Sequence, residues 1–324
     1  MRHDTPTPFA KIPIGISGCL LGERVRFDGG HKQDPYLTDT LGPFFEYVPV
    51  CPEVGCGLPV PRESMRLVGT PEANRLIGNK TGTDYTDRMQ AYCDATAEAL
   101  KTRNLHGFIF KAKSPSSGLF RVKLYTPDGM PLTQHTSGLF ARTFTRAFPL
   151  LPCEEEGRLH DPALRENFIE RVFALKRFRD EVRAAPSVRA LQDFHAAAKY
   201  LLMAHAPEAL KGLGQLAATA APDNLAATLD GYERGFLACL ATPATIGRHV
   251  NVLQHMQGYF SGQLTPMERE ELADVLAEYA REHVPLIVPI TLFRHYIRKY
   301  QTGYLMRQHY LYPHPSELKL RNHA

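Results

Sequence analysis

The sequence predicts an α/β domain followed by an all-α domain. In the first half, short runs of β-forming residues alternate with a helical stretch, which is typical of an α/β layer. From about residue 160 onward, nearly every stretch instead shows the apolar spacing of a helix. The chain has 324 residues, enough for two domains that each bury a core. We place the boundary near residue 185, which gives domains 1–185 and 186–324.

Three short buried strands are expected in the first domain, at 12–18, 45–50 and 107–112. Each is rich in β-forming residues and ends in, or runs into, Gly, Pro or Ser. A helix is expected at about 84–103, because its apolar positions recur at helical spacing. A further strand is expected at 119–126. This alternation predicts a Rossmann-like domain with a largely parallel sheet.

The second half is predicted to be helical throughout. A charged helical stretch at 162–183 is followed by the break Ala185-Pro186-Ser187. Six further helices are expected after this break, at 187–205, 207–219, 222–240, 244–261, 265–283 and 288–304.

The composition is that of an ordinary globular protein, with 44% apolar and 22% charged residues. The net charge of +4 permits a polyanionic partner without requiring one. The sequence has no run of about 18 apolar residues, and its first residues lack the apolar region of a secretory signal. We therefore expect a cytoplasmic protein. In that compartment the six cysteines indicate buried thiols, metal ligands or nucleophiles rather than disulfides.

Three unusual turns follow the three expected strands. They are Cys19-Leu20-Leu21-Gly22, Cys51-Pro52-Glu53 and Ser114-Pro115-Ser116-Ser117-Gly118. Ligands of parallel α/β sheets bind beyond the carboxyl ends of the strands. We therefore expect the three turns to converge on one crevice.

The residue types in these turns indicate a particular chemistry. Thiols at two strand ends, Cys19 and Cys51, suit a soft metal or an iron–sulfur cluster. Glu53 follows two residues after Cys51, and an acid beside a metal is a natural general acid or base. The turn at Ser114 offers hydroxyls and backbone N–H groups for an anion or a substrate oxygen. By spacing alone, the two cysteines could also be buried small residues, which is the less favoured interpretation.

The chain resembles the two-domain TudS/RudS-type desulfidases, which remove sulfur from thiouracil or from 4-thiouridine in tRNA. The stretches that carry the resemblance in the first half are Ser17–Gly22, Val25–Gly29, Val50–Glu53, Leu58–Arg62 and Lys113–Ser116. The second half resembles the YbgA-type helical domain that is often fused to it. The matching stretches there are Phe194-His195, Lys199–His205, Asn251–His255 and Val284–Pro289.

The resemblance implies a mechanism and a set of site residues. Three cysteines would hold a [4Fe–4S] cluster whose open iron binds the substrate sulfur, and the sulfur would leave as hydrosulfide with no net redox change. Carried over to this sequence, Cys19 and Cys51 are cluster ligands, and Glu53 and Ser114 assist the attack of water. The residues expected to contact the substrate are Arg26, Asp28, Arg62 and Lys113.

The third turn departs from the family pattern Ser-Pro-Ser-Cys-Gly, because Ser117 stands where the third cysteine belongs. A hydroxyl is a far poorer ligand than a thiolate for such a cluster. Three explanations are open. We rank an engineered Cys→Ser change first, because the surrounding residues match. The others are a natural variant with a weakened or absent cluster, and Cys56 as the third ligand. We expect the chain as written to hold little intact cluster.

The other three cysteines receive structural interpretations. Cys93 lies on the apolar face of the expected helix at 84–103, and Cys239 lies among apolar residues of another helix, so both are expected in the core. Cys153 is expected in a linker-like loop, between Leu151-Pro152 and three glutamates.

The tail from Arg294 to Tyr312 interleaves basic residues with tyrosines. Such a pattern suits RNA, because cations attract phosphates and tyrosines stack on bases. It equally suits a packed helix with solvated cations. We prefer tRNA as the partner, because a base within tRNA must leave its stack to reach the site and a second domain could grip the surrounding RNA.

Two alternatives to this function remain open. The first is an enzyme that acts on free thiouracil or thionucleosides, with the helical domain serving dimerisation. The second is a non-catalytic iron–sulfur or thiol sensor that binds nucleic acid. A sensor would not require Glu53 or Ser114.

Overall fold

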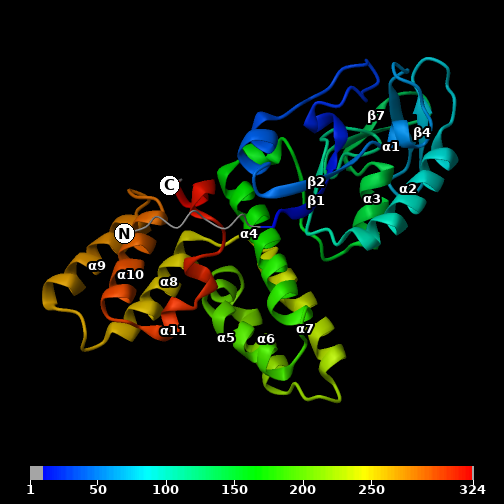
Figure 1. Ribbon diagram of the computed structural model, residues 1–324. Coiled ribbons are helices and arrows are strands. Elements are labelled where there is room, and N and C mark those ends of the chain that lie inside the picture. The colour runs from blue at the N-terminus through cyan, green and yellow to red at the C-terminus, as the bar shows by residue number, and fades with distance from the viewer. Residues whose placement is uncertain (1–9, 323–324) are drawn as a thin grey trace. The chain divides into compact units, whose positions relative to one another are not determined.

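A computed structural model describes residues 10–322 of the chain. It divides the chain into two compact units, with the first ending at Asp161 and the second beginning at Pro162 (Figure 1). The boundary expected near residue 185 therefore lies too far along the chain. The helical stretch that begins at Pro162 packs against helices of the second unit, and the break at Ala185-Pro186-Ser187 is a turn between two of its helices.

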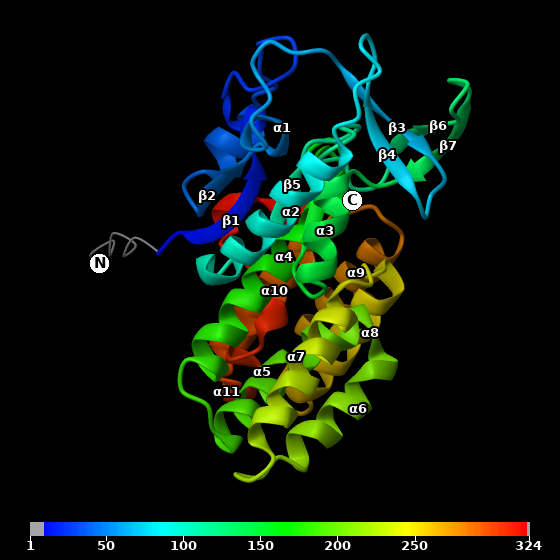
Figure 2. The ribbon, with the colours of Figure 1, turned by 90° about the vertical axis from the view of Figure 1, so that its right-hand side faces the viewer.

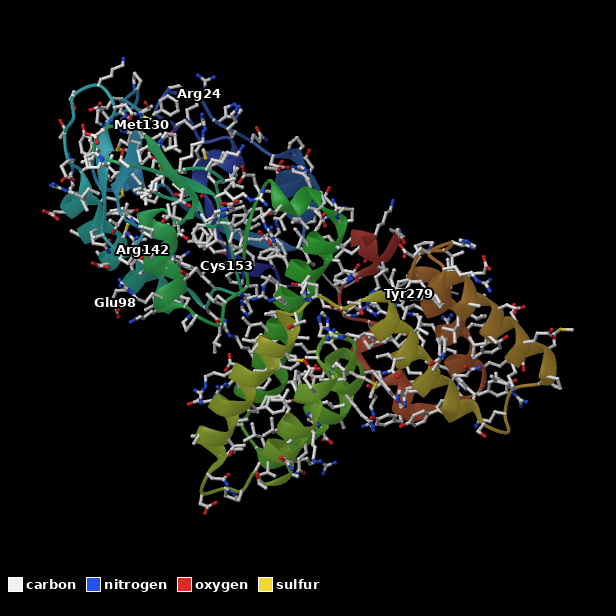
Figure 3. The ribbon with its side chains drawn as sticks, turned by 180° about the vertical axis from the view of Figure 1, so that it is seen from behind. Arg24, Glu98, Met130, Arg142, Cys153 and Tyr279 are labelled. Atoms are coloured by element: carbon white, nitrogen blue, oxygen red, sulfur yellow. The ribbon has the colours of Figure 1, made fainter. Side chains whose placement is uncertain are left out.

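A four-stranded parallel sheet forms the centre of the first unit. Its strands are β1 (Ile12–Ser17), β2 (Phe45–Val50), β5 (Phe108–Phe110) and β8 (Cys153–Glu155). They lie in the order β2-β1-β5-β8, and every neighbouring pair is parallel. The first three strands confirm the sequence prediction. Cys153 begins β8 instead of lying in a linker-like loop (Figure 3), because it pairs with Phe108 of β5.

Helices α2 (Thr86–Leu100) and α3 (Leu139–Ala147) lie side by side in this unit (Figure 2). The helix predicted at 84–103 is α2, and Cys93 on it is fully buried, as expected. Helix α3 covers β5 through aromatic contacts, with the rings of Phe108 and Phe144 4.6 Å apart between their centroids. Part of the core of the first unit therefore lies between β5 and α3.

A second, mixed sheet was not foreseen from the sequence. It contains β3 (Met65–Gly69), β4 (Asn74–Gly78), β6 (Val122–Tyr125) and β7 (Pro131–Thr136), in the order β4-β3-β6-β7. The strand expected at 119–126 is β6, and it belongs to this sheet instead of the parallel one. Its β propensity was correctly detected, but propensity does not specify which strand will be its partner.

Five short helices complete the first unit. They are η1 (Gly18–Leu21), η2 (Tyr36–Leu41), α1 (Pro52–Gly55), η3 (Lys101–Arg103) and η4 (Arg158–His160). Two of them carry site residues, because η1 contains the first turn and α1 begins within the second. The α/β architecture expected for this part of the chain is thus present.

The described part of the second unit contains helices and no strand, as predicted. Its longer helices are α4 (Pro162–Phe178), α5 (Val188–His205), α6 (Pro207–Ala218), α7 (Leu225–Leu240), α8 (Ile246–Gln257), α9 (Pro266–Ala280) and α10 (Ile287–Lys299). Helix η5 (Arg179–Arg183) continues α4. The remaining short segments are η6 (Gly258–Phe260), α11 (Gly303–Met306), η7 (His309–Leu311), η8 (Ser316–Leu318) and η9 (Leu320–Asn322).

Aromatic residues from three helices form a core in the second unit. Phe178 of α4, Phe194 of α5 and Phe236 of α7 pack with ring centroids 5.2–6.1 Å apart. Cys239 of α7 is buried as well, which confirms its expected place in the core. Among residues 10–322, no helix has the length and apolar character needed to span a membrane.

Candidate active site

The three turns line one cavity of about 430 Å³ in the first unit. Cys19 follows β1, Cys51 follows β2, and Ser114–Ser117 follow β5. Because β2, β1 and β5 are adjacent and parallel, their carboxyl ends lie at the same edge of the sheet. The structure therefore confirms the convergence that the strand assignment predicted.

The two thiols of this crevice are shielded from solvent. Cys19 is 8% exposed, and burial raises the pKa of its thiol to about 11, against the opposing effect of Lys111. Burial also raises the pKa of the Cys51 thiol, whose Sγ lies 3.8 Å from the carbonyl oxygen of Val25. Thiolates are the metal-binding form of cysteine. A metal centre held here would therefore have to displace both protons as it binds.

The third turn is held by its own serine and by helix α3. The backbone N–H groups of Ser116 and Ser117 lie 3.3 and 3.1 Å from Ser114 Oγ, which accepts hydrogen bonds from them. The Ser116 carbonyl accepts a hydrogen bond from the N–H of Phe140 at 2.9 Å, which satisfies one of the free donors at the start of α3. Ser114, predicted as a catalytic residue, thus shapes the turn that presents its neighbours.

Glu53 is fixed at both carboxylate oxygens. Ser116 Oγ donates to Glu53 Oε1 at 2.9 Å, and Arg62 Nε donates to Oε2 at 2.8 Å. Arg62 also donates through Nη2 to the carbonyl of Val25 at 2.8 Å. The side chain of Arg62 is only 5% exposed, and that of Glu53 is 14% exposed. The acid predicted beside the cysteines is therefore a half-buried, oriented carboxylate.

Sequence reasoning singled out Ser114 and missed Ser116 as the direct partner of Glu53. The two hydroxyl oxygens lie 3.0 Å apart, so the serines form one chain that ends at the carboxylate. Ser116 lies 63 residues from Glu53 in the sequence, so no local pattern indicated this contact. The repeated Ser-x-Ser spacing within the turn was the only available hint, since both side chains can project from the same side of a tight turn.

Several cations line the same crevice. Lys111 forms an ion pair with Glu156, whose other oxygen accepts the N–H of Ala112 at 2.7 Å. Lys32 and Lys113 line the cavity, are exposed, and have no carboxylate partner among the described residues. Arg26 lines it as well and pairs with Asp28 at 3.4 Å. Lys32 was not predicted, because it lies in the loop that follows the first turn and is not part of any of the three turns.

Two predicted residues do not line the crevice. Asp28 is exposed, and the N–H of Gly30 is the main factor that lowers its pKa. Cys56 lies just beyond α1 and donates its thiol to the carbonyl of Glu53 at 3.3 Å. Because the structure does not bring Cys56 into the cavity with Cys19 and Cys51, it does not support Cys56 as the third ligand.

The donor set does not fit a cluster that requires three thiolates. Cys19, Cys51 and Ser117 line one cavity, but the third position offers a hydroxyl, and Ser117 is 4% exposed. Among residues 10–322, no three His, Cys, Asp or Glu side chains are grouped so as to hold a metal ion. A cysteine at position 117 would supply the missing sulfur from a turn that is already in place.

Most of the tail from Arg294 to Tyr312 packs within the second unit. Lys299 and Tyr300 both contact Glu268 of α9, and Tyr310 and His309 are buried. Of the two interpretations of this segment, packing therefore accounts for most of its cations and tyrosines. Tyr312 stays partly exposed, with the guanidinium of Arg294 4.3 Å from its ring centroid.

Comparison with known proteins matches each half of the chain separately. The family described as 2-thiouracil desulfurase matches residues 14–156, and a protein family of unknown function, DUF1722, matches residues 199–315. The uncharacterized protein YbgA of Escherichia coli (strain K12) is 31% identical over 153 residues, which cover 47% of this chain and 90% of that protein. A solved structure of the [4Fe–4S]-dependent thiouracil desulfidase TudS is 27% identical. It covers 48% of this chain and 98% of that one, with a TM-score of 0.39.

Proposed function

This chain belongs to the two-domain family in which a TudS-type 2-thiouracil desulfurase domain precedes a YbgA-like helical domain, and from that premise we propose that its crevice is built to remove sulfur from 4-thiouridine in tRNA. One observation carries the proposal. A half-buried carboxylate, Glu53, is oriented at both oxygens in the same cavity as two thiols, the buried Cys19 and the half-buried Cys51. We further propose that Ser117 leaves the site without its third sulfur ligand.

The proposed reaction exchanges one atom at a thiocarbonyl carbon. Water supplies the oxygen of the product carbonyl, the carbon–sulfur bond breaks, and sulfur leaves as hydrosulfide. No electrons are gained or lost overall. The protein must therefore move protons and orient the base, tasks for which an acid or base within hydrogen-bond reach is suited.

Glu53 is the residue to which we assign the proton transfers. Ser116 and Arg62 hold its two oxygens, so the carboxylate does not need to reorient when a water molecule reaches it. Ser114 supports Ser116 through the hydroxyl contact and shapes the backbone of the turn. Its role is to position the turn, and Ser116 makes the direct contact with Glu53.

The cations of the crevice favour a substrate that carries phosphates. Lys32 and Lys113 line the cavity without carboxylate partners among the described residues, whereas free thiouracil has no negative group for them to bind. A nucleotide within tRNA brings phosphates on both sides of the base. This arrangement supports 4-thiouridine in tRNA over the free base, which is the alternative substrate.

The test begins with anaerobic iron–sulfur reconstitution of the chain and of its Ser117→Cys variant. The unchanged chain should hold little iron and sulfide, and the variant should gain both together with visible charge-transfer absorbance. Adding Cys56→Ser to that variant is the matched control, and it should leave the cluster content unchanged because Cys56 lies outside the cavity. A full complement of cluster in the unchanged chain would contradict the role given to Ser117.

Activity then distinguishes the substrates and the non-catalytic alternative. The reconstituted Ser117→Cys variant should convert thiolated tRNA with a kcat/KM at least tenfold above that for 4-thiouridine nucleoside or 2-thiouracil. Adding Glu53→Gln should abolish turnover while the cluster absorbance remains. Equal turnover of all three substrates would refute the tRNA assignment. A Glu53→Gln variant of undiminished activity would refute the catalytic role of Glu53.

A further inference from the structure

Phe27 is an exposed aromatic residue to which the proposed reaction gives no role. It is 40% exposed and lines the same cavity as Glu53 and the two thiols. Among the described residues that line this cavity, it is the only one with an aromatic ring. A single exposed apolar side chain is common on protein surfaces, so the place of Phe27 in the cavity, more than its exposure, indicates a function.

A tight turn fixes the position of Phe27. The N–H of Gly29 donates to the carbonyl of Arg26 at 3.0 Å, and the N–H of Arg26 donates to the carbonyl of Gly30 at 3.3 Å. Gly29 has a φ of 77°, in the left-handed region that glycine adopts without steric cost. Asp28 Oδ1 closes the turn by accepting the N–H of Gly30 at 3.0 Å. The ring is therefore presented by a backbone that is already ordered.

The same turn is bonded to the arginine that orients Glu53. The backbone N–H of Arg62 donates to the carbonyl of Phe27 at 2.8 Å, and its Nη2 donates to the carbonyl of Val25 at 2.8 Å. Its Nε donates to Glu53 Oε2 at 2.8 Å. Arg62 thus connects the backbone of Phe27 to the carboxylate, so a base in contact with the ring would take a defined position relative to Glu53.

The charges around the ring limit which ligands can use it. The guanidinium carbon of Arg26 lies 5.4 Å from the ring centroid, and Phe27 keeps its 40% exposure with this arginine in place. Lys32 and Lys113 line the same cavity. A ligand here must be flat to stack on the ring and must tolerate several cations. A nucleotide has both properties, because its base stacks on aromatic side chains and its phosphate is attracted to cations.

We propose that Phe27 is a specificity-determining residue that stacks on the pyrimidine ring of the substrate nucleotide. This inference rests on the proposed function, which supplies a nucleotide as the substrate. The stack favours a planar base over a saturated ring, and over acyclic thioamides that carry the same thiocarbonyl group. Stacking of one base on an aromatic side chain changes affinity by roughly 5- to 150-fold.

Calorimetry on the unchanged full chain tests the stack with two ligands that differ in the planarity of the base. Uridine 5′-phosphate has a flat ring, whereas 5,6-dihydrouridine 5′-phosphate carries the same carbonyls, N–H and phosphate on a puckered ring. The flat ligand should bind at least about fivefold more tightly. Ribose 5-phosphate should bind no more tightly than the puckered ligand. Equal binding of the two nucleotides would overturn the proposal, as would the absence of binding by uridine 5′-phosphate.

Variants then assign the preference to one ring. Phe27→Ala should abolish the preference for the flat base and leave ribose 5-phosphate binding unchanged, whereas Phe27→Tyr should retain the preference. Phe120→Ala is the matched control, because Phe120 is 41% exposed, lies 4.8 Å from the guanidinium of Arg158 at its ring centroid, and does not line the cavity. It should bind both nucleotides as the unchanged chain does. A Phe27→Ala variant that is folded by circular dichroism and keeps the full preference would refute the stack.

Absorbance gives a second readout that needs neither a cluster nor turnover. The near-ultraviolet thiocarbonyl band of 4-thiouridine 5′-phosphate should lose intensity when the saturated unchanged chain stacks the base, and equal loss with Phe27→Ala would contradict the stack. The two proposals can fail separately. A stack without turnover of thiolated tRNA by the reconstituted Ser117→Cys variant would contradict the proposed function alone. Turnover together with an unchanged nucleotide affinity in Phe27→Ala would contradict the role of Phe27 alone.

Discussion

Replacing Arg62 with methionine should destabilise the first unit by roughly 3–5 kcal/mol, the usual cost of leaving one charge of a buried pair without its partner. The Arg62 and Glu53 side chains are 5% and 14% exposed, so water reaches the carboxylate only in part and compensates incompletely for the lost guanidinium. Methionine keeps most of the apolar stem, which limits the contribution of lost packing. The loss should therefore report mainly on the uncompensated carboxylate of Glu53.

The same unit offers a matched control. Arg75 pairs with Asp84, but its side chain is 70% exposed, and ion pairs of this kind contribute about 0–1 kcal/mol. Arg75→Met should therefore change the free energy of unfolding little. The double change Arg62→Met with Glu53→Gln should recover part of the loss, because it removes the stranded charge.

Denaturant unfolding measures these differences. The chain has no tryptophan, so circular dichroism is the natural probe of both units. Guanidinium titrations of the four chains give the free energies of unfolding by linear extrapolation. If Arg62→Met and Arg75→Met cost the same, or if the double change costs more than Arg62→Met alone, the buried pair does not have the role that its geometry implies.

Two further predictions concern the serine chain and the response to acid. In the reconstituted Ser117→Cys background, Ser116→Ala should lower kcat by roughly 10- to 100-fold, because it removes a hydrogen bond to a charged group worth about 1.5–3 kcal/mol. Ser116→Thr should retain most of the activity, and equal rates for both variants would contradict the contact. In the second unit, burial lowers the pKa of His309 to about 3, from 6.5, and that of His314 to about 4. A histidine with a depressed pKa leaves the unfolded chain binding more protons, so stability is full above pH 6.5 and is lost as the pH falls toward the folded pKa. At about pH 5 the loss from His309 alone should reach about 2 kcal/mol. His309→Asn should flatten the measured pH dependence by that amount, and an unchanged slope would refute the assignment.

Local sequence patterns were sufficient to locate the site. Strands at 12–17, 45–50 and 108–110 follow from short runs of β-forming residues that are closed by Gly, Pro or Ser. Once these strands are parallel and adjacent, the turns after them must share one edge of the sheet. The helical second half was also predictable from local patterns, because a helix places apolar residues three and four positions apart in the sequence. The substitution at Ser117 was visible only against the family pattern.

Tertiary structure decided which side chains meet. Ser116 and Glu53 are 63 residues apart, and no periodicity links them, so only the structure shows that Ser116 contacts Glu53. Cys56 lies five positions from Cys51, yet at the end of α1 its thiol donates to the carbonyl of Glu53, and Cys56 does not line the crevice. Secondary structure depends mainly on residues that are close in the sequence. A site depends on how elements that are distant in the sequence pack against one another.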